Sequence, residues 1–88
     1  MSMKPVKDLK VGDRVKLKQA ISNEIVKSWK YANACDNVAG GIQANTVFTI
    51  VEAHATSFPR VKLQIPGRDP PGYLTVSGEE LSWKFSLV

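Results

Sequence analysis

Short stretches that alternate between apolar and polar residues limit the fold of this chain more than any other feature. Successive side chains of a β-strand point to opposite faces, so a two-residue period predicts half-buried strands. The period is clear at residues 14–18 and 61–65, and it recurs at 73–76 and 81–87. Residues 46–54 are β-branched or apolar almost without a break, which predicts a strand that is bent or covered on both faces. We therefore predict an all-β fold whose interior is filled by Val15, Leu17, Ile50, Leu63, Leu74 and Phe85.

The segments between the predicted strands differ sharply in length and character. Residues 66–72 contain three prolines and two glycines, which predicts a hairpin loop. Residues 77–81 read as a short turn, plausible as one helical turn capped by Ser77. We assign the alternation of residues 81–87 to a terminal strand with Trp83 and Phe85 packed on its inner side.

Residues 19–45 form the longest connection. Apolar residues recur there at spacings of four, four and three, at Ile21, Ile25, Trp29 and Ala32. This spacing predicts a short helix over residues 22–33, with Ser22 or Asn23 as its N-cap, and an irregular excursion is the alternative. A connection of this length inside a small domain is often functional.

Two stretches resemble the SH3-like small β-barrels of bacteria and phages. Residues 9–17 read LKVGDRVKL, like the opening strand of such barrels, and residues 72–81 read GYLTVSGEEL, like their closing turn and strand. The resemblance implies one domain over residues 1–88, a five-stranded SH3-like barrel with residues 19–45 as an elaborated first loop. Residues 18–28 lack the aromatic pair of the eukaryotic SH3 peptide site, so a proline-rich ligand is not expected. The resemblance fixes no function.

The residues that support catalysis or metal binding are scarce. The chain has 88 residues, so its core is thin and a deep active site is not expected. Cys35 and His54 are its only cysteine and histidine, too few for a zinc site. We expect no catalytic residue, metal or cofactor, and hence no enzyme. A lone cysteine fits a reducing compartment, and without a long apolar run or a signal sequence we expect a cytoplasmic protein with no membrane contact.

Charge is distributed unevenly along the chain. Residues 1–30 carry eight basic and three acidic side chains, whereas residues 31–88 carry four basic and five acidic ones. This asymmetry raises the odds of an anionic partner, and the alternative is a lysine-rich face that keeps the protein in solution. Nucleic-acid binding is one hypothesis, since residues 27–31 read KSWKY and the basic side chains of Arg14, Lys16 and Lys18 line one face of a predicted strand.

A protein-interaction module, such as an accessory subunit or a bacterial or phage regulatory protein, is the hypothesis we favour. Aromatic side chains of the long loop, the 55–59 loop and the strand at 73–76 would form a patch of the kind enriched in binding hot spots. A self-associating structural role is a third possibility. For Trp29, the alternative to a binding role is that it packs the predicted helix of residues 22–33 onto the barrel. The partner and the oligomeric state stay open. The predicted binding residues are Lys16, Lys18, Lys27, Trp29, Lys30, Tyr31, Phe58, Arg60 and Tyr73.

Overall fold

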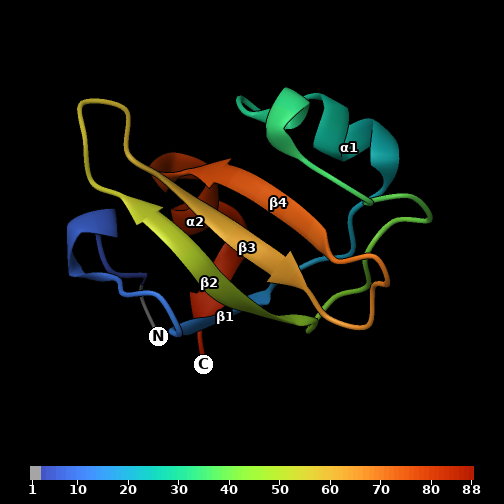
Figure 1. Ribbon diagram of the computed structural model, residues 1–88, viewed down its shortest axis with the longest axis horizontal. Coiled ribbons are helices and arrows are strands. Elements are labelled where there is room, and N and C mark those ends of the chain that lie inside the picture. The colour runs from blue at the N-terminus through green and yellow to red at the C-terminus, as the bar shows by residue number, and fades with distance from the viewer. Residues whose placement is uncertain (1–2) are drawn as a thin grey trace.

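A five-stranded antiparallel sheet dominates the computed structural model, which describes residues 3–88 (Figure 1). Its strands are β1 (Arg14–Leu17), β2 (Val47–His54), β3 (Arg60–Ile65), β4 (Gly72–Ser77) and β5 (Phe85–Leu87). The helical elements are η1 (Val6–Asp8), α1 (Asn23–Lys27), η2 (Ala32–Ala34) and α2 (Gly78–Lys84). The prediction of a mainly β fold with five strands is confirmed.

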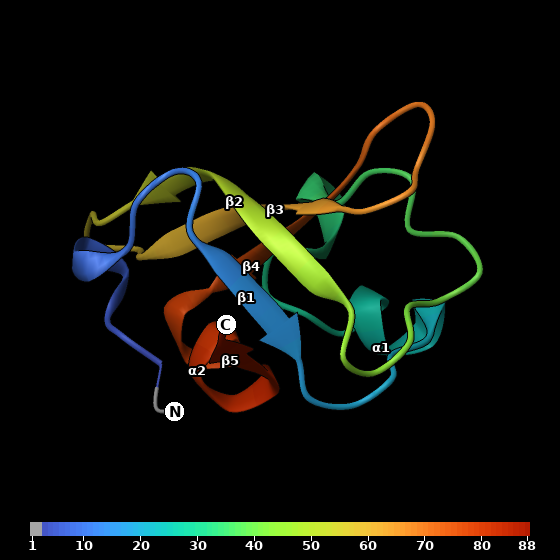
Figure 2. The ribbon, with the colours of Figure 1, turned by 90° about the horizontal axis from the view of Figure 1, so that it is seen from below.

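The sheet is open and has the strand order β4-β3-β2-β1-β5. β1 to β4 form a meander broken by the long first loop, and β5 returns to pair with β1. β4 and β5 are therefore the two edges, and the sheet is not closed into a barrel. α2 connects these two edges and lies beneath the sheet beside β5 (Figure 2).

The hydrophobic core is formed by the inward-facing side chains of the strands together with residues of the long loop and α2. All six side chains predicted to fill the interior are at most 1% exposed. Phe85 is central, because its ring packs edge-to-face on Phe48, with 5.5 Å between the ring centroids. The pairing of β2 with β3 has a bulge, where the register shifts between Ile50 and Glu52. Such a bulge bends a strand, which agrees with the bent strand predicted from its continuous apolar sequence.

The prediction of a strand over residues 81–87 is wrong for its first half. Residues 78–84 form α2, and only Phe85–Leu87 are extended. Ser77 begins the helix through a capping box: its Oγ accepts from the N–H of Glu80, and the Glu80 carboxylate accepts from the N–H of Ser77. Leu81 and Phe85 are four residues apart, a spacing that places both on one side in a helix as well as in a strand. Trp83 lies between them and is 75% exposed.

The long first loop packs along the edge of the sheet beside β4. Its helix α1 covers only part of the predicted range, and of the two predicted N-cap residues, Ser22 and Asn23, it is Ser22 that accepts from the N–H of Ile25, at 3.4 Å. Further on, Asp36 and Tyr73 exchange two backbone hydrogen bonds of 2.8 and 3.0 Å. Thr75 Oγ1 also donates to the carbonyl of Ala34 at 3.2 Å, so Thr75 is buried although its strand position faces outward. The loop thus occupies part of the β4 edge.

None of the helices in residues 3–88 has the length and apolar character needed to cross a lipid bilayer.

Candidate functional site

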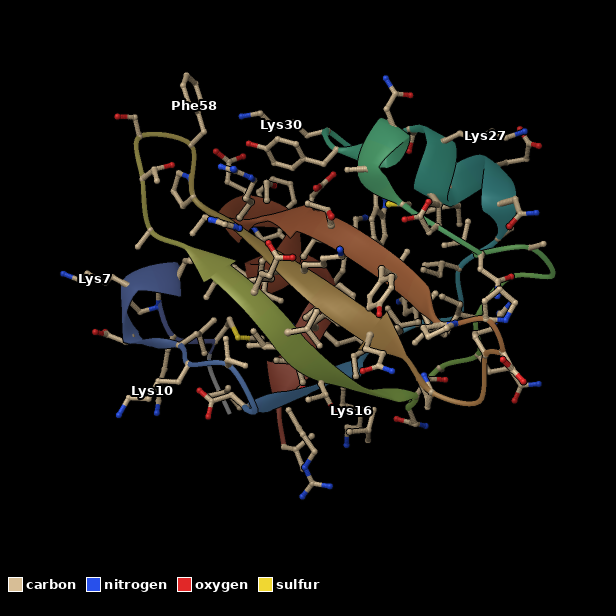
Figure 3. The ribbon with its side chains drawn as sticks, in the orientation of Figure 1. Lys7, Lys10, Lys16, Lys27, Lys30 and Phe58 are labelled. Atoms are coloured by element: carbon tan, nitrogen blue, oxygen red, sulfur yellow. The ribbon has the colours of Figure 1, made fainter. Side chains whose placement is uncertain are left out.

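Four of the predicted binding residues lie together at one end of the sheet. The Lys30 ammonium is 5.7 Å from the centroid of the Tyr31 ring and 5.8 Å from that of Phe58. The Arg60 guanidinium is 6.0 Å from the Tyr31 centroid. We call Lys30, Tyr31, Phe58 and Arg60 the cation–aromatic cluster; Figure 3 shows Lys30 and Phe58 on the same side of the molecule. The cluster joins the long first loop to the β2–β3 hairpin.

Local hydrogen bonds hold the members of the cluster in position. In the β2–β3 loop, Thr56 Oγ1 accepts from the N–H of Phe58 at 3.2 Å, and Arg60 Nη1 donates to the Phe58 carbonyl at 3.2 Å. The backbone N–H of Lys30 donates to Glu80 Oε2 at 3.1 Å, which ties the long loop to α2. Phe58 nevertheless stays 64% exposed. The cluster therefore presents an aromatic ring beside two cations.

The other predicted lysines do not join the cluster. Lys16 lies on β1, Lys18 follows this strand, and Lys27 ends α1, where its ammonium is 3.6 Å from Glu24. Figure 3 shows Lys16 and Lys27 at separate margins of the molecule, with Lys7 and Lys10 at another. The excess charge of the first 30 residues is thus distributed over several faces of the molecule.

Trp29 is buried, which does not agree with its prediction as a surface binding residue. Only 5% of it is exposed, and its ring packs edge-to-face on Phe85 at a centroid distance of 6.3 Å. The Lys84 ammonium lies 5.7 Å from the same ring. Trp29 thus packs the long loop onto the core, the alternative role considered for it.

Tyr73 lies on the outer face of the sheet but away from the cluster. In the β3–β4 register it is opposite Gln64, whereas Arg60 is opposite Ser77 at the other end of the pairing. The Lys62 ammonium is 4.4 Å from the centroid of the Tyr73 ring. Of the predicted binding residues, Lys30, Tyr31, Phe58 and Arg60 thus lie together, whereas Tyr73 lies apart from them.

A groove beside the cluster was not predicted from the sequence. It has a volume of about 460 Å³ and lies where the N-terminal segment, the β2–β3 loop and α2 meet. The Gly78 N–H donates to the Pro59 carbonyl at 3.1 Å and holds the loop against the helix. Lys30 belongs to both the groove and the cluster, so the two adjoin. The lining residues are Met3, Lys4, Pro5, Val6, Lys30, Pro59, Ser77, Gly78, Glu79, Ser82 and Trp83.

Trp83 is a second residue that sequence reasoning misplaced, in the opposite sense from Trp29. Its side chain lines the groove and has the largest exposed fraction among the large apolar residues of the described chain. Assigning residues 77–84 to a capped helix would have placed Trp83 on a different side from Leu81 and Phe85. The helical turn predicted over residues 77–81 with Ser77 as its cap is confirmed, and the missed step is that this helix continues to Lys84; the capping-box sequence SGEE at residues 77–80 favours such a longer helix.

A second, smaller hollow of about 230 Å³ lies on the outer face of the sheet. Glu52 is its central charge: Oε1 is 3.0 Å from His54 Nε2, and Oε2 is 3.5 Å from Lys62 Nζ. The hydrogen bond from His54, followed by the charge of Lys62, lowers the pKa of Glu52 below its ordinary value. The Glu52 carboxylate therefore already has two partners, and Arg60 of the cluster also lines this hollow.

The lowered pKa of Glu52 predicts a pH dependence of stability. The Glu52 carboxylate binds a proton more weakly in the folded state than in the unfolded state. Its contacts with His54 and Lys62 therefore stabilise the fold at pH values above the ordinary glutamate pKa of about 4.3. The stabilisation is lost as the pH falls through the lowered pKa. In urea titrations, Glu52→Gln should therefore show a smaller loss of stability from pH 5 to pH 3 than the wild type, with a small effect because the carboxylate is exposed. Identical slopes for both proteins would contradict this assignment.

The remaining groups with chemical potential are isolated from one another. Burial raises the pKa of the Cys35 thiol, whose Sγ lies 3.6 Å from the Tyr31 carbonyl oxygen. A raised pKa disfavours the nucleophilic thiolate at neutral pH. Within residues 3–88, no three His, Cys, Asp or Glu side chains gather closely enough to hold a metal ion.

Comparison with protein-family models, with curated proteins and with solved structures finds no match to this chain.

Proposed function

We propose that the chain is a non-catalytic protein-interaction module that binds its partner through the groove and the adjoining cation–aromatic cluster. The observation that carries the proposal is Trp83, which is 75% exposed and lines a groove of about 460 Å³ next to Lys30. Exposed tryptophan is costly in water and is enriched among residues that dominate binding energy. The lone cysteine supports a reducing, cytoplasmic setting for this interaction.

The cluster strengthens this proposal, because it adds further side chains of the types that dominate interfaces. Phe58 and Tyr31 supply rigid aromatic area. Arg60 supplies an arginine, a residue type that is enriched at hot spots. All three lie at the same end of the sheet as the groove, connected to it by Lys30.

We also propose that the fold is an open form of the SH3-like barrel. The pairing of β5 with β1 supports this, since it brings the last strand back beside the first. α2 connects the two edge strands, where a closed barrel would need them to pair. Other members of this fold class use loops around the sheet for different partners, so the fold adds no preference among functions.

Replacing Trp83 with alanine tests the proposed function. We expect Trp83→Ala to weaken partner binding by about 30-fold, equivalent to about 2 kcal/mol for a hot-spot residue. The unfolding free energy should change by less than about 0.5 kcal/mol, because the side chain is exposed. Partners captured from nuclease-treated bacterial lysate by the wild type would be identified, and their affinities measured by calorimetry.

Val11→Ala is the matched control, since Val11 is 67% exposed and lies outside the groove. It should bind like the wild type. Equal affinities for the Trp83→Ala and wild-type proteins would show that the groove is not the binding site.

Nucleic-acid binding is the second candidate, favoured by one observation. Lys30 and Arg60 lie beside the rings of Tyr31 and Phe58, and single-stranded nucleic acids bind where cations and stacking rings alternate. Binding of this kind weakens steeply with added salt. Partners that disappear from the capture on nuclease treatment would favour it over the protein-interaction module.

A further inference from the structure

The two cations of the cluster have no acidic partner within the described chain. Two other lysines do form ion pairs: Lys27 with Glu24, and Lys62 with Glu52. Among residues 3–88, no carboxylate lies within 4.0 Å of the charged nitrogens of Lys30 or Arg60. These two positive charges are therefore available to an anionic group of a partner.

The aromatic rings restrict where these charges can lie. Lys30 is near both the Tyr31 and Phe58 rings, and Arg60 is near Tyr31 while also donating to the Phe58 carbonyl. Cation–ring contacts and the hydrogen bond reduce the number of rotamers available to the two long side chains. Lys30 and Arg60 therefore lose less side-chain entropy when they pair with an incoming carboxylate than a freely moving surface lysine would lose.

The groove beside the cluster suits an apolar side chain. Trp83, Pro59 and Val6 contribute apolar surface, and the absence of a side chain at Gly78 leaves space between α2 and the β2–β3 loop. A Cβ placed on Gly78 would lie 3.4 Å from Val6 Cγ2 and 3.7 Å from Pro59 Cβ. The positive Lys4 and Lys30 outnumber the single carboxylate of the groove, Glu79.

We propose that the partner presents a short acidic peptide segment, with a carboxylate that binds Lys30 and Arg60 and a neighbouring apolar side chain that enters the groove against Trp83. This inference rests on the proposed function and specifies the chemistry of its partner. A nucleic-acid strand fits less well, because it carries a phosphate at every nucleotide and needs a track of cations. Lys7, Lys10, Lys16 and Lys27 lie at separate margins of the molecule and do not extend the cluster into such a track (Figure 3).

A selection from a phage-displayed library of short random peptides tests this chemistry. The wild-type protein should enrich sequences with aspartate or glutamate next to a large apolar residue. Synthetic copies of the enriched peptides would then be measured by fluorescence anisotropy against the wild type, Trp83→Ala, and the double variant Lys30→Gln/Arg60→Gln. We expect the double variant to bind about tenfold more weakly, and high salt to reduce wild-type affinity to a similar degree.

Lys10→Gln is the matched charge control and should bind within about twofold of the wild type, since Lys10 is exposed and distant from the cluster (Figure 3). Thermal melts of all variants verify that they fold.

The possible outcomes separate the two proposals. Peptides that lose affinity in Trp83→Ala but show no acidic enrichment and no effect of Lys30→Gln/Arg60→Gln would overturn the acidic-segment inference and leave the interaction module standing. Peptides unaffected by Trp83→Ala would overturn both. Single-stranded oligodeoxythymidine that binds more tightly than any enriched peptide, and is lost in the double variant, would assign the cluster to nucleic acid and overturn the inference.

Discussion

Replacing Trp29 with alanine should leave much of the protein unfolded at ambient temperature. The ring is buried, packs against Phe85 and connects the long first loop to the core. Truncating a buried aromatic residue costs about 3–5 kcal/mol through lost burial and the cavity left behind. The whole stability of a chain of this size is of the same order, about 3–5 kcal/mol from its core. Urea titration followed by circular dichroism measures the loss.

The two tryptophans of the chain provide the control for this prediction. Trp83→Ala removes the same side chain from an exposed position and should alter stability by less than about 0.5 kcal/mol. Trp29→Phe should cost less than Trp29→Ala, because it keeps most of the ring and loses an indole Nε1 that has no hydrogen-bond partner among the described residues. Similar unfolding midpoints for Trp29→Ala and Trp83→Ala would refute the assignment of Trp29 to the core.

Gly41→Ala should be the second strongly destabilising substitution, at about 2–4 kcal/mol. Gly41 has φ of +74°, a left-handed conformation that costs an L-residue about 1–2 kcal/mol. In addition, its Cβ would lie 2.8 Å from the carbonyl oxygen of Ile21, closer than side-chain carbons approach backbone oxygens. That carbonyl accepts the 2.8 Å hydrogen bond from Ile42 that closes the long loop, so relief of the clash opens the loop.

Gly40→Ala separates the two causes. Gly40 has a similar φ of +86°, but a Cβ there would have no neighbour within 4 Å. It should therefore cost only the conformational part, about 1–2 kcal/mol. Chemical denaturation of both variants gives the difference. If the two alanine variants were equally stable, close packing at Gly41 would not contribute to the fold.

The sheet was predictable from the sequence because strict alternation of apolar and polar residues fits a half-buried strand and does not fit a helix. Val15, Leu17 and Leu63 alternate with polar neighbours and point inward as expected. The C-terminal segment was not, because Leu81 and Phe85 share a side in either a strand or a helix. The capping box at Ser77 stabilises the start of a helix, and this local hydrogen bonding outweighs the hydrophobic alternation of residues 81–87.

The candidate site was predictable in part for a similar reason. Lys30, Tyr31, Phe58 and Arg60 were expected to contribute to binding because of their residue types, and these four lie together. Tryptophan is also common at binding surfaces, so residue type alone favoured a surface position for Trp29. Its burial depends on the path of the connection over residues 19–45, which hydrophobic periodicity does not determine. The groove lies between segments distant in sequence, so no local pattern could indicate it.

The Glu80 carboxylate has a consequence for the kinetics expected at the proposed binding surface. One of its oxygens accepts from the N–H and hydroxyl of Ser77 at the start of α2, and the other accepts from the backbone N–H of Lys30. The helix that bears Trp83 and the loop that bears Lys30 are thus fastened to each other before any encounter. A preorganised surface loses little conformational freedom on association, so we expect rigid-body docking in a single kinetic phase.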